Sequence, residues 1–202
     1  MSYWDAVGLI NKVKNVVMNY SEWEIKVRDA TNNEPWGASS TLMKEIARGT
    51  YQIDSFNDIM NTIYTRLTEC TDDKWRQCYK ALQLLEYLIK NGSEKVIRSC
   101  HENIYVIRAL QKFIYVDPNG KDQGINVRAR AKEIYDLLKN KDKINEERAK
   151  AKENRNKYKG VSSDKARYQG FGSSSGFGSG TSKTSFSSNC NYQNIFQIIY
   201  GW

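Results

Sequence analysis

WDAVGLINKVKNVVMNYSEWEIKVRDATNNEPW, residues 4–36, contains two successive helical patterns separated by Asn19 and Tyr20. At 100° per residue, the apolar side chains of the first pattern fall within one arc of about 120°; they are Ala6, Leu9, Ile10, Val13, Val16 and Val17. Lys12 and Lys14 lie on the two borders of this arc. The pattern predicts an amphipathic helix within residues 1–18. Its apolar face would either pack on the rest of the domain or lie in a lipid headgroup layer.

The second pattern begins with a capping box at Ser21 and Glu24, because a serine followed three residues later by glutamate lets each side chain reach the other's backbone amide. A helix is therefore predicted from Ser21 to about Thr31, ended by the segment before Pro35. Trp36 is expected to be buried, docking this turn onto the domain.

Apolar residues at helical spacing continue after Trp36. Helices are predicted over residues 39–48, from 54 or 55 to about 67, over 75–90, from 93 to about 112 with a bend near His101, and over 125–139. Gly49 is expected to be the C′ residue of the first of these. Residues 75–90 are apolar on most sides, which is typical of a central helix. Residues 141–157 are almost wholly charged and predict an exposed helix that frays. The fold class is all-α, a right-handed solenoid of about eight helices.

From residue 160 onward glycine and serine dominate, and Lys183 is the sole charged side chain between Tyr168 and Trp202. This composition predicts a disordered, low-complexity tail. We expect three parts: an amphipathic helix in residues 1–18, a helical domain in 19–158 and the tail in 159–202. The apolar end, residues 194–202, is either a peptide motif for a partner or an artefact of an alternative transcript end.

The chain carries 31 lysines and arginines against 23 acids, a formal net charge of +8, which favours an anionic partner without choosing between membrane, nucleic acid and acidic protein. The four cysteines are widely spaced and indicate a reducing compartment. Neither a signal peptide nor a run of about 18 apolar residues is visible. We expect a cytoplasmic protein whose membrane contact is peripheral.

No nucleophile motif, phosphate loop or metal-ligand spacing occurs in the sequence. Its one histidine, His101, follows Cys100 on a predicted helix, where adjacent side chains point about 100° apart. We therefore expect no catalysis, no metal and no cofactor. The basic residues do not gather on one recognition helix, so nucleic-acid binding is not expected.

Four segments of the chain resemble the epsin N-terminal homology (ENTH) domain. They are NVVMNYSEWEIKVRDATNNEPWGASSTLMKEIA, KWRQCYKALQLLEYLIKNGSEKV, YVDPNGKDQGINVR and INEERAKAKENRNKY. The matches follow in order over roughly residues 4–160. Within the family, WDAVGLINKVKNVVMNYSE and KYKGVSSD are most similar to the branch of epsin-related clathrin interactors.

The resemblance implies a headgroup site for a phosphoinositide between the first helix, the second and the start of the central one. The residues at matching or neighbouring positions are Lys14, Arg28, Asn33, Arg66, Arg76 and Lys80. Taken alone, each is an ordinary solvated charge or polar side chain. The resemblance also implies that the first helix inserts into one leaflet through Leu9, Ile10, Val13, Val16 and Val17.

Three differences from epsins weaken the expected charge of this site. Asn11 stands where some epsins carry a base, acids precede Trp75, and Gln77 replaces a histidine. Fewer cations suit phosphatidylinositol 4-phosphate better than the 4,5-bisphosphate.

We therefore expect a peripheral adaptor in clathrin-mediated traffic at the trans-Golgi network, endosomes and clathrin-coated vesicles. The alternatives are an epsin-like adaptor at the plasma membrane and an interaction module for SNARE cargo with incidental lipid binding. Clathrin and adaptor complexes are further possible partners. The tail, however, lacks Asp-Pro-Trp, Asn-Pro-Phe and an acidic clathrin-box run.

Overall fold

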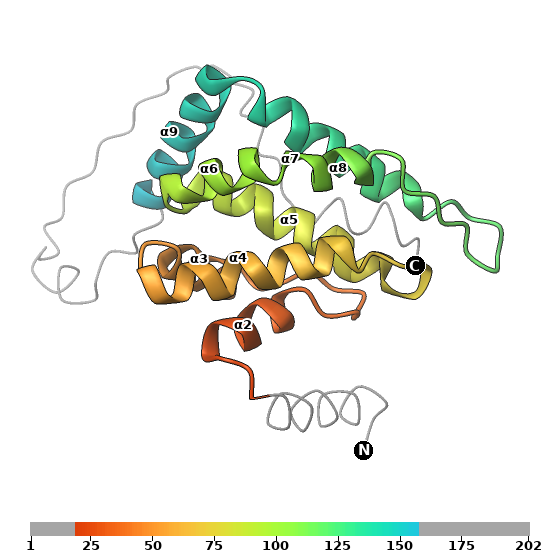
Figure 1. Cartoon of the computed structure of the whole chain (residues 1–202). Helices are drawn as coiled ribbons and strands as arrows, with labels where there is room; N and C mark the ends of the chain where they lie inside the picture. The colour runs from red at the N-terminus through yellow and green to blue at the C-terminus, as the bar shows by residue number, and fades with distance from the viewer. Residues whose placement is uncertain (1–18, 158–202) are drawn as a thin grey trace, which may run out of the picture. The chain divides into compact units, whose positions relative to one another are not determined.

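The computed structural model describes residues 19–157. Eight α-helices and one 3₁₀ turn make up this part of the chain. They are α2 (Glu22–Ala30), α3 (Ser40–Gly49), α4 (Ile53–Thr68), η1 (Asp72–Lys74), α5 (Trp75–Asn91), α6 (Glu94–Glu102), α7 (Ile104–Leu110), α8 (Gly124–Leu138) and α9 (Lys141–Lys157). Figure 1 shows them stacked in chain order from α2 to α9. The predicted all-α, right-handed solenoid is confirmed.

The capping box at the start of α2 is confirmed. The Glu24 amide donates to Ser21 Oγ at 3.2 Å, and the Ser21 amide donates to the Glu24 carboxylate at 2.7 Å. Because both orphan donors are satisfied, the helix begins at the predicted residue.

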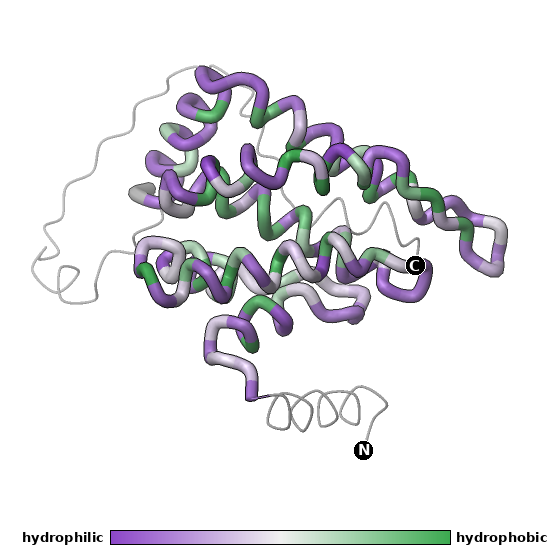
Figure 2. The backbone as a smooth tube through the Cα atoms, in the orientation of Figure 1, coloured by the Kyte–Doolittle hydropathy of each residue, from purple (hydrophilic) through white to green (hydrophobic). Residues whose placement is uncertain are grey.

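Helix α5 is the central helix, as its apolar sequence predicted. It packs against α3, α4, α8 and α9. Its buried side chains form the middle of the core, with Leu82, Leu84, Leu85, Leu88 and Ile89 at most 1% exposed. Figure 2 shows these hydrophobic positions recurring along α5, whereas α9 is mostly hydrophilic.

Gly49 does not end α3 as a left-handed residue; it is the last residue of the helix, and Thr50 caps it. A Cβ at Gly49 would lie 2.5 Å from the indole of Trp23. Glycine is therefore needed here because α2 and α3 approach each other closely, and not because the backbone makes a turn.

The segment predicted as one bent helix is two helices, α6 and α7, separated by Asn103. The Asn103 side chain donates to the Ser99 carbonyl at 3.0 Å, and its backbone amide donates to the same carbonyl at 3.1 Å, so that Asn103 caps the end of α6. The bend expected near His101 is thus a full break two residues later. Cys100 is buried and His101 exposed, so the two side chains diverge as expected.

The prediction of an exposed, fraying α9 is wrong in part. Ile144 is 3% exposed and joins the core. Arg148 donates to the carbonyls of Ile89 at 2.6 Å and Gly92 at 2.7 Å. The last carbonyls of α5 lack intrahelical partners, and Arg148 satisfies two of them, so that α9 is docked on α5.

The predicted N-terminal helix and the predicted disordered tail lie outside the described residues, and the three-part division remains a prediction. Cys78 and Cys100 are buried free thiols, and Cys70 is half-buried. Burial raises the pKa of the Cys100 thiol to about 12.

Candidate anion-binding site

Arg28 lies in the last turn of α2, where a cation is favoured by the helix dipole. Its guanidinium stacks on the ring of Tyr20, 3.8 Å from the ring centroid. Tyr20 directly precedes the capping box, so the box that starts the helix also places this ring. The Arg28 Nε is buried and has no hydrogen-bond partner.

Arg66 lies in the last turn of α4 and donates from Nη1 to the Gln77 side-chain oxygen of α5. Its Nε is also buried without a partner. Burial and then the neighbouring charge of Arg28 lower the pKa of the Arg66 guanidinium. Two helix ends, from α2 and α4, therefore bring two guanidinium groups close together.

Arg76 and Lys80 lie one turn apart on α5 and supply the other two cations. The Arg76 guanidinium stacks on Trp75, 4.7 Å from the ring centroid, and its Nε is a third buried atom without a partner. Lys80 is 6% exposed. Its Nζ donates to Asn32 Oδ1 at 2.6 Å.

Burial lowers the pKa of Lys80 to about 8; the charge of Arg76 acts in the same direction, and that of Glu34 opposes it. A lysine held in this way gains charge when an anion binds beside it, because the anion offsets the cost of desolvation.

The loop between α2 and α3 closes one side of this group. The Asn33 side chain is exposed and donates to the Asp73 carbonyl at 3.2 Å, which ties the loop to η1. Trp36, expected to be buried, is 54% exposed; its indole N–H donates to Glu34 Oε2 at 3.0 Å. The loop is therefore held by polar contacts rather than by a buried tryptophan.

We call Arg28, Arg66, Arg76 and Lys80 the cation cluster. Within residues 19–157, no ion pair involves any of them, although acids pair with other lysines and arginines of the domain. A partly buried cation without a carboxylate costs stability, so four together indicate a site completed by an anion. Arginine forks suit the oxygens of a phosphate.

The structure thus places Arg28 near Arg66 and Arg76 near Lys80 on three helices that contact one another, α2, α4 and α5, with Asn33 in the loop that follows α2. Lys14 and the predicted membrane-inserting residues Leu9, Ile10, Val13, Val16 and Val17 lie outside the described residues. Sequence reasoning missed Tyr20, Asn32 and, as a supporting residue, Gln77. These contacts join residues 8 to 48 positions apart, so periodicity carries no signal for them.

Among residues 19–157, no group of three or more histidine, cysteine or acidic side chains is arranged to hold a metal ion. In the same part of the chain, no helix has the length and apolar character needed to cross a membrane.

Fold and cluster together define a helical domain that carries four cations without an ion pair within residues 19–157. The chain belongs to the ENTH domain family, whose model matches residues 20–144. Epsin-3 of Saccharomyces cerevisiae is 51% identical over 188 residues, covering 93% of this chain and 44% of that protein. Human Clathrin interactor 1 is 49% identical over 164 residues, covering 81% of this chain and 26% of that protein. The chain therefore spans less than half the length of these relatives.

The solved structure of the epsin-2 ENTH domain in complex with phosphatidylinositol 4,5-bisphosphate has a similar fold. The TM-score is 0.64 and the identity 35%, with 68% of this chain and 96% of that chain covered.

Proposed function

We propose that the cation cluster binds the headgroup of a phosphoinositide and that the chain is a peripheral membrane adaptor of clathrin-mediated traffic rather than an enzyme. The observation that carries this proposal is that Arg28, Arg66, Arg76 and Lys80 are at least partly buried and form no ion pair within residues 19–157. Each arginine retains unused donors, and two or three phosphates need several convergent donors. The family supports the assignment, since the epsin-2 ENTH domain forms a complex with such a lipid.

Phosphatidylinositol 4-phosphate is the lipid we propose as preferred. The pKa of Arg66 and that of Lys80 are both lowered by burial, and the charges of Glu69 and Glu34, respectively, oppose this lowering in part. These acids reduce the positive potential at the rim of the cluster. A headgroup with one phosphomonoester demands less charge than the 4,5-bisphosphate, which is the alternative.

Residues 4–17 are proposed to fold on the membrane, with Lys14 facing the headgroup and the apolar arc in the acyl region. Partial burial of Val13 and its neighbours contributes less than the ~1.5–3 kcal/mol of full burial. Ordering the helix backbone opposes it with about 1 kcal/mol per residue. Binding is therefore reversible and depends on lipid composition.

The compartments we propose are the trans-Golgi network and endosomes, with the plasma membrane as the alternative. The similarity to Clathrin interactor 1 supports a place in clathrin-coated vesicles. Clathrin, adaptor complexes and SNARE cargo are proposed as partners of the whole protein.

Liposome co-sedimentation with single phosphoinositides tests the headgroup site. Arg28→Ala and Arg76→Ala are expected to weaken binding several-fold. Arg108→Ala, which removes an exposed arginine of α7, is the matched control and should bind like the parent. Because Arg28 and Arg66 repel each other, removing one is not expected to lower the melting temperature. Equal binding by all three variants would place the site elsewhere.

Val13→Glu places a charge in the apolar arc and should abolish stable binding and tubulation of liposomes while residues 19–157 stay folded. Asn11→Ala, on the polar side, should change little. Unfolding of the domain by Val13→Glu would show that this segment belongs to the core. Binding that is indifferent to phosphoinositide would instead favour the SNARE-binding module.

A further inference from the structure

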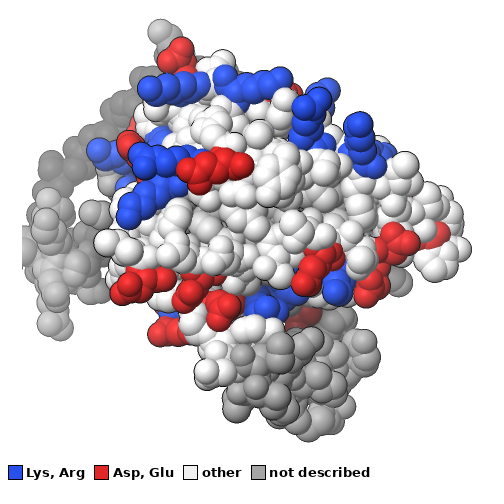
Figure 3. Space-filling model, in the orientation of Figure 1, with Lys and Arg blue, Asp and Glu red and all other residues white. Residues whose placement is uncertain are grey.

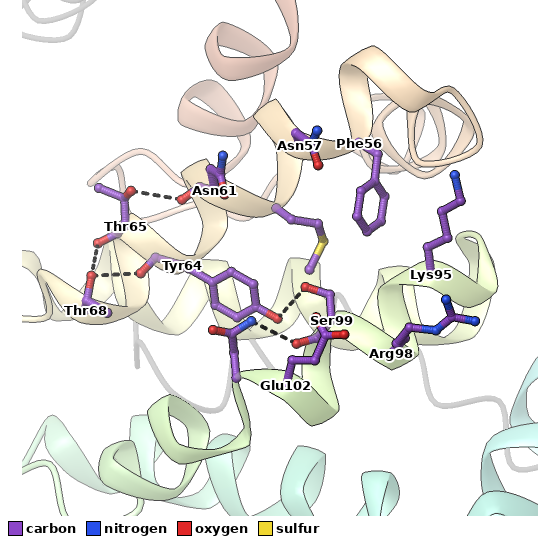
Figure 4. A pocket seen from close by; sticks show the side chains of 12 residues that line it. Phe56, Asn57, Asn61, Tyr64, Thr65, Thr68, Lys95, Arg98, Ser99 and Glu102 are labelled. Carbon is purple, nitrogen blue, oxygen red and sulfur yellow. Dashed lines mark hydrogen bonds between the residues drawn. The ribbon is translucent and has the colours of Figure 1, made fainter.

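A cavity away from the cation cluster opens between α4 and α6 and has a volume of about 690 Å³. We call it the α4–α6 groove. Figure 4 shows its two walls, with α4 on one side and α6 on the other. Its apolar floor consists of Phe56, Met60 and Tyr64, of which Met60 is buried and the other two are half-buried. Its volume is in the range of ligand-binding clefts.

The α4 wall carries two exposed amides, Asn57 and Asn61, which lie one turn apart. Within the described residues, neither side-chain amide has a hydrogen-bond partner. Each amide offers two donors and an acceptor, the set that a peptide backbone group can satisfy. Two such amides at a spacing of one turn suit an extended chain lying along α4.

The α6 wall is charged at one end. Lys95 and Arg98 are exposed, lie beside Phe56 at that end, and form no ion pair within residues 19–157 (Figure 4). Glu102 lies farther along the same wall, near Tyr64. A ligand with a negative charge at one end and none at the other complements this arrangement.

The nearby acid of α4 does not cancel the two cations. Asp58 accepts a hydrogen bond from Ser21 Oγ at 2.7 Å, and this contact holds it toward α2. On the face that Figure 3 shows, the middle is largely uncharged, with mostly Lys and Arg above it and mostly Asp and Glu below.

We propose that the α4–α6 groove binds an extended peptide of a partner protein, in which an acidic residue stands close to a large apolar side chain. The acid would pair with Lys95 and Arg98, the apolar side chain would cover Phe56 and Met60, and the backbone would bond Asn57 and Asn61. Residues 169–202 of the tail do not offer such a side chain, because Lys183 is the sole charged side chain among them.

A membrane fits the groove less well than a peptide does. The groove carries two cations and one acid, so it attracts an anionic membrane surface less strongly than the cation cluster, which has four cations. The paired amides, which match a peptide backbone, have no counterpart in a lipid surface. The groove and the cation cluster also use different faces of α4, because Arg66 is directed to Gln77 of α5.

A peptide selection tests the proposal. A decapeptide library displayed on phage is selected against the full 202-residue chain, and the enriched peptide is synthesised and titrated by fluorescence anisotropy. We expect enrichment of an acid next to a large apolar residue. Arg98→Glu and Asn61→Ala should each weaken binding at least about tenfold with unchanged melting temperatures, whereas Lys132→Glu, an exposed charge on α8, should not.

A charge exchange sharpens the test. Replacing the acid of the peptide by lysine should abolish binding to the parent and restore it with Arg98→Glu. The proposal is overturned if no such peptide is enriched, or if Arg98→Glu and the parent bind it equally. It is also overturned if Arg98→Glu leaves peptide binding intact but weakens sedimentation with phosphatidylinositol 4-phosphate liposomes, since this face would then contact the membrane.

Discussion

Raising the pH from 7 to 9 removes most of the charge of Lys80 without altering its neighbours on the cation cluster. Because the pKa of Lys80 is about 8, the side chain is about 90% protonated at pH 7 and about 10% at pH 9. A phosphomonoester is already close to fully ionised in this range, since its second pKa is about 6. If only the charged lysine binds, the affinity falls about tenfold, which corresponds to about 1.4 kcal/mol.

Lys80→Arg is the matched control, because arginine remains charged throughout this range. It shares the α-amino group and every other titrating side chain with the parent. We expect its affinity for the headgroup to be nearly independent of pH. Isothermal titration of soluble inositol 1,4-bisphosphate, the headgroup of phosphatidylinositol 4-phosphate, at constant ionic strength measures both profiles without the surface potential of a liposome.

Loss of affinity at high pH is distinguishable from unfolding by the direction in which the stability of the domain changes with pH. The pKa of Lys80 is lower in the folded domain than in the unfolded chain, so between about pH 8 and 10.5 the unfolded chain binds more protons. This group therefore increases the stability of the domain as pH rises through that window. A flat profile for the parent, or an equal fall for Lys80→Arg, would refute a role for Lys80 in charge recognition.

Three stability predictions follow from contacts in the fold. Trp36→Ala should leave the melting temperature nearly unchanged, because the side chain is 54% exposed; a large fall in calorimetry would contradict this. Gly49→Ala should lower the free energy of unfolding by about 1–3 kcal/mol in urea titration, because the new Cβ would overlap the Trp23 indole; equal stability would mean that α2 can shift. Arg148→Ala should cost about 1–3 kcal/mol, because two carbonyls at the end of α5 lose a charged donor. Hydrogen exchange should then accelerate in α9 first, and uniform protection would show that Ile144 alone docks the helix.

The helices could be predicted where local chemistry decides them. The Ser21–Glu24 capping box sets the start of α2 from two side chains three residues apart, and its geometry is as expected. The apolar face of residues 75–90 likewise indicated the central helix, because a segment apolar on most sides must be buried. Both signals lie within a few residues of the structure they specify.

Features that depend on distant residues required the tertiary structure. The close packing at Gly49 and the docking of α9 through Arg148 each depend on contacts that no periodicity encodes. Trp36 reads as a buried anchor in the sequence, yet its loop is held by Glu34 and Asn33 instead.

For the candidate site, too, the sequence indicated some features and the tertiary structure decided the others. Resemblance to the family indicated Arg28, Arg66, Arg76 and Lys80, but sequence alone makes each an ordinary surface charge. Folding places the ends of α2 and α4 beside the start of α5, leaves three guanidinium Nε atoms buried without partners and lowers the pKa of Lys80. The sequence by itself determined which helices form, because their signals are local. Only the tertiary structure decided which charges share one low-dielectric site, because desolvation and repulsion depend on distances in space rather than along the chain.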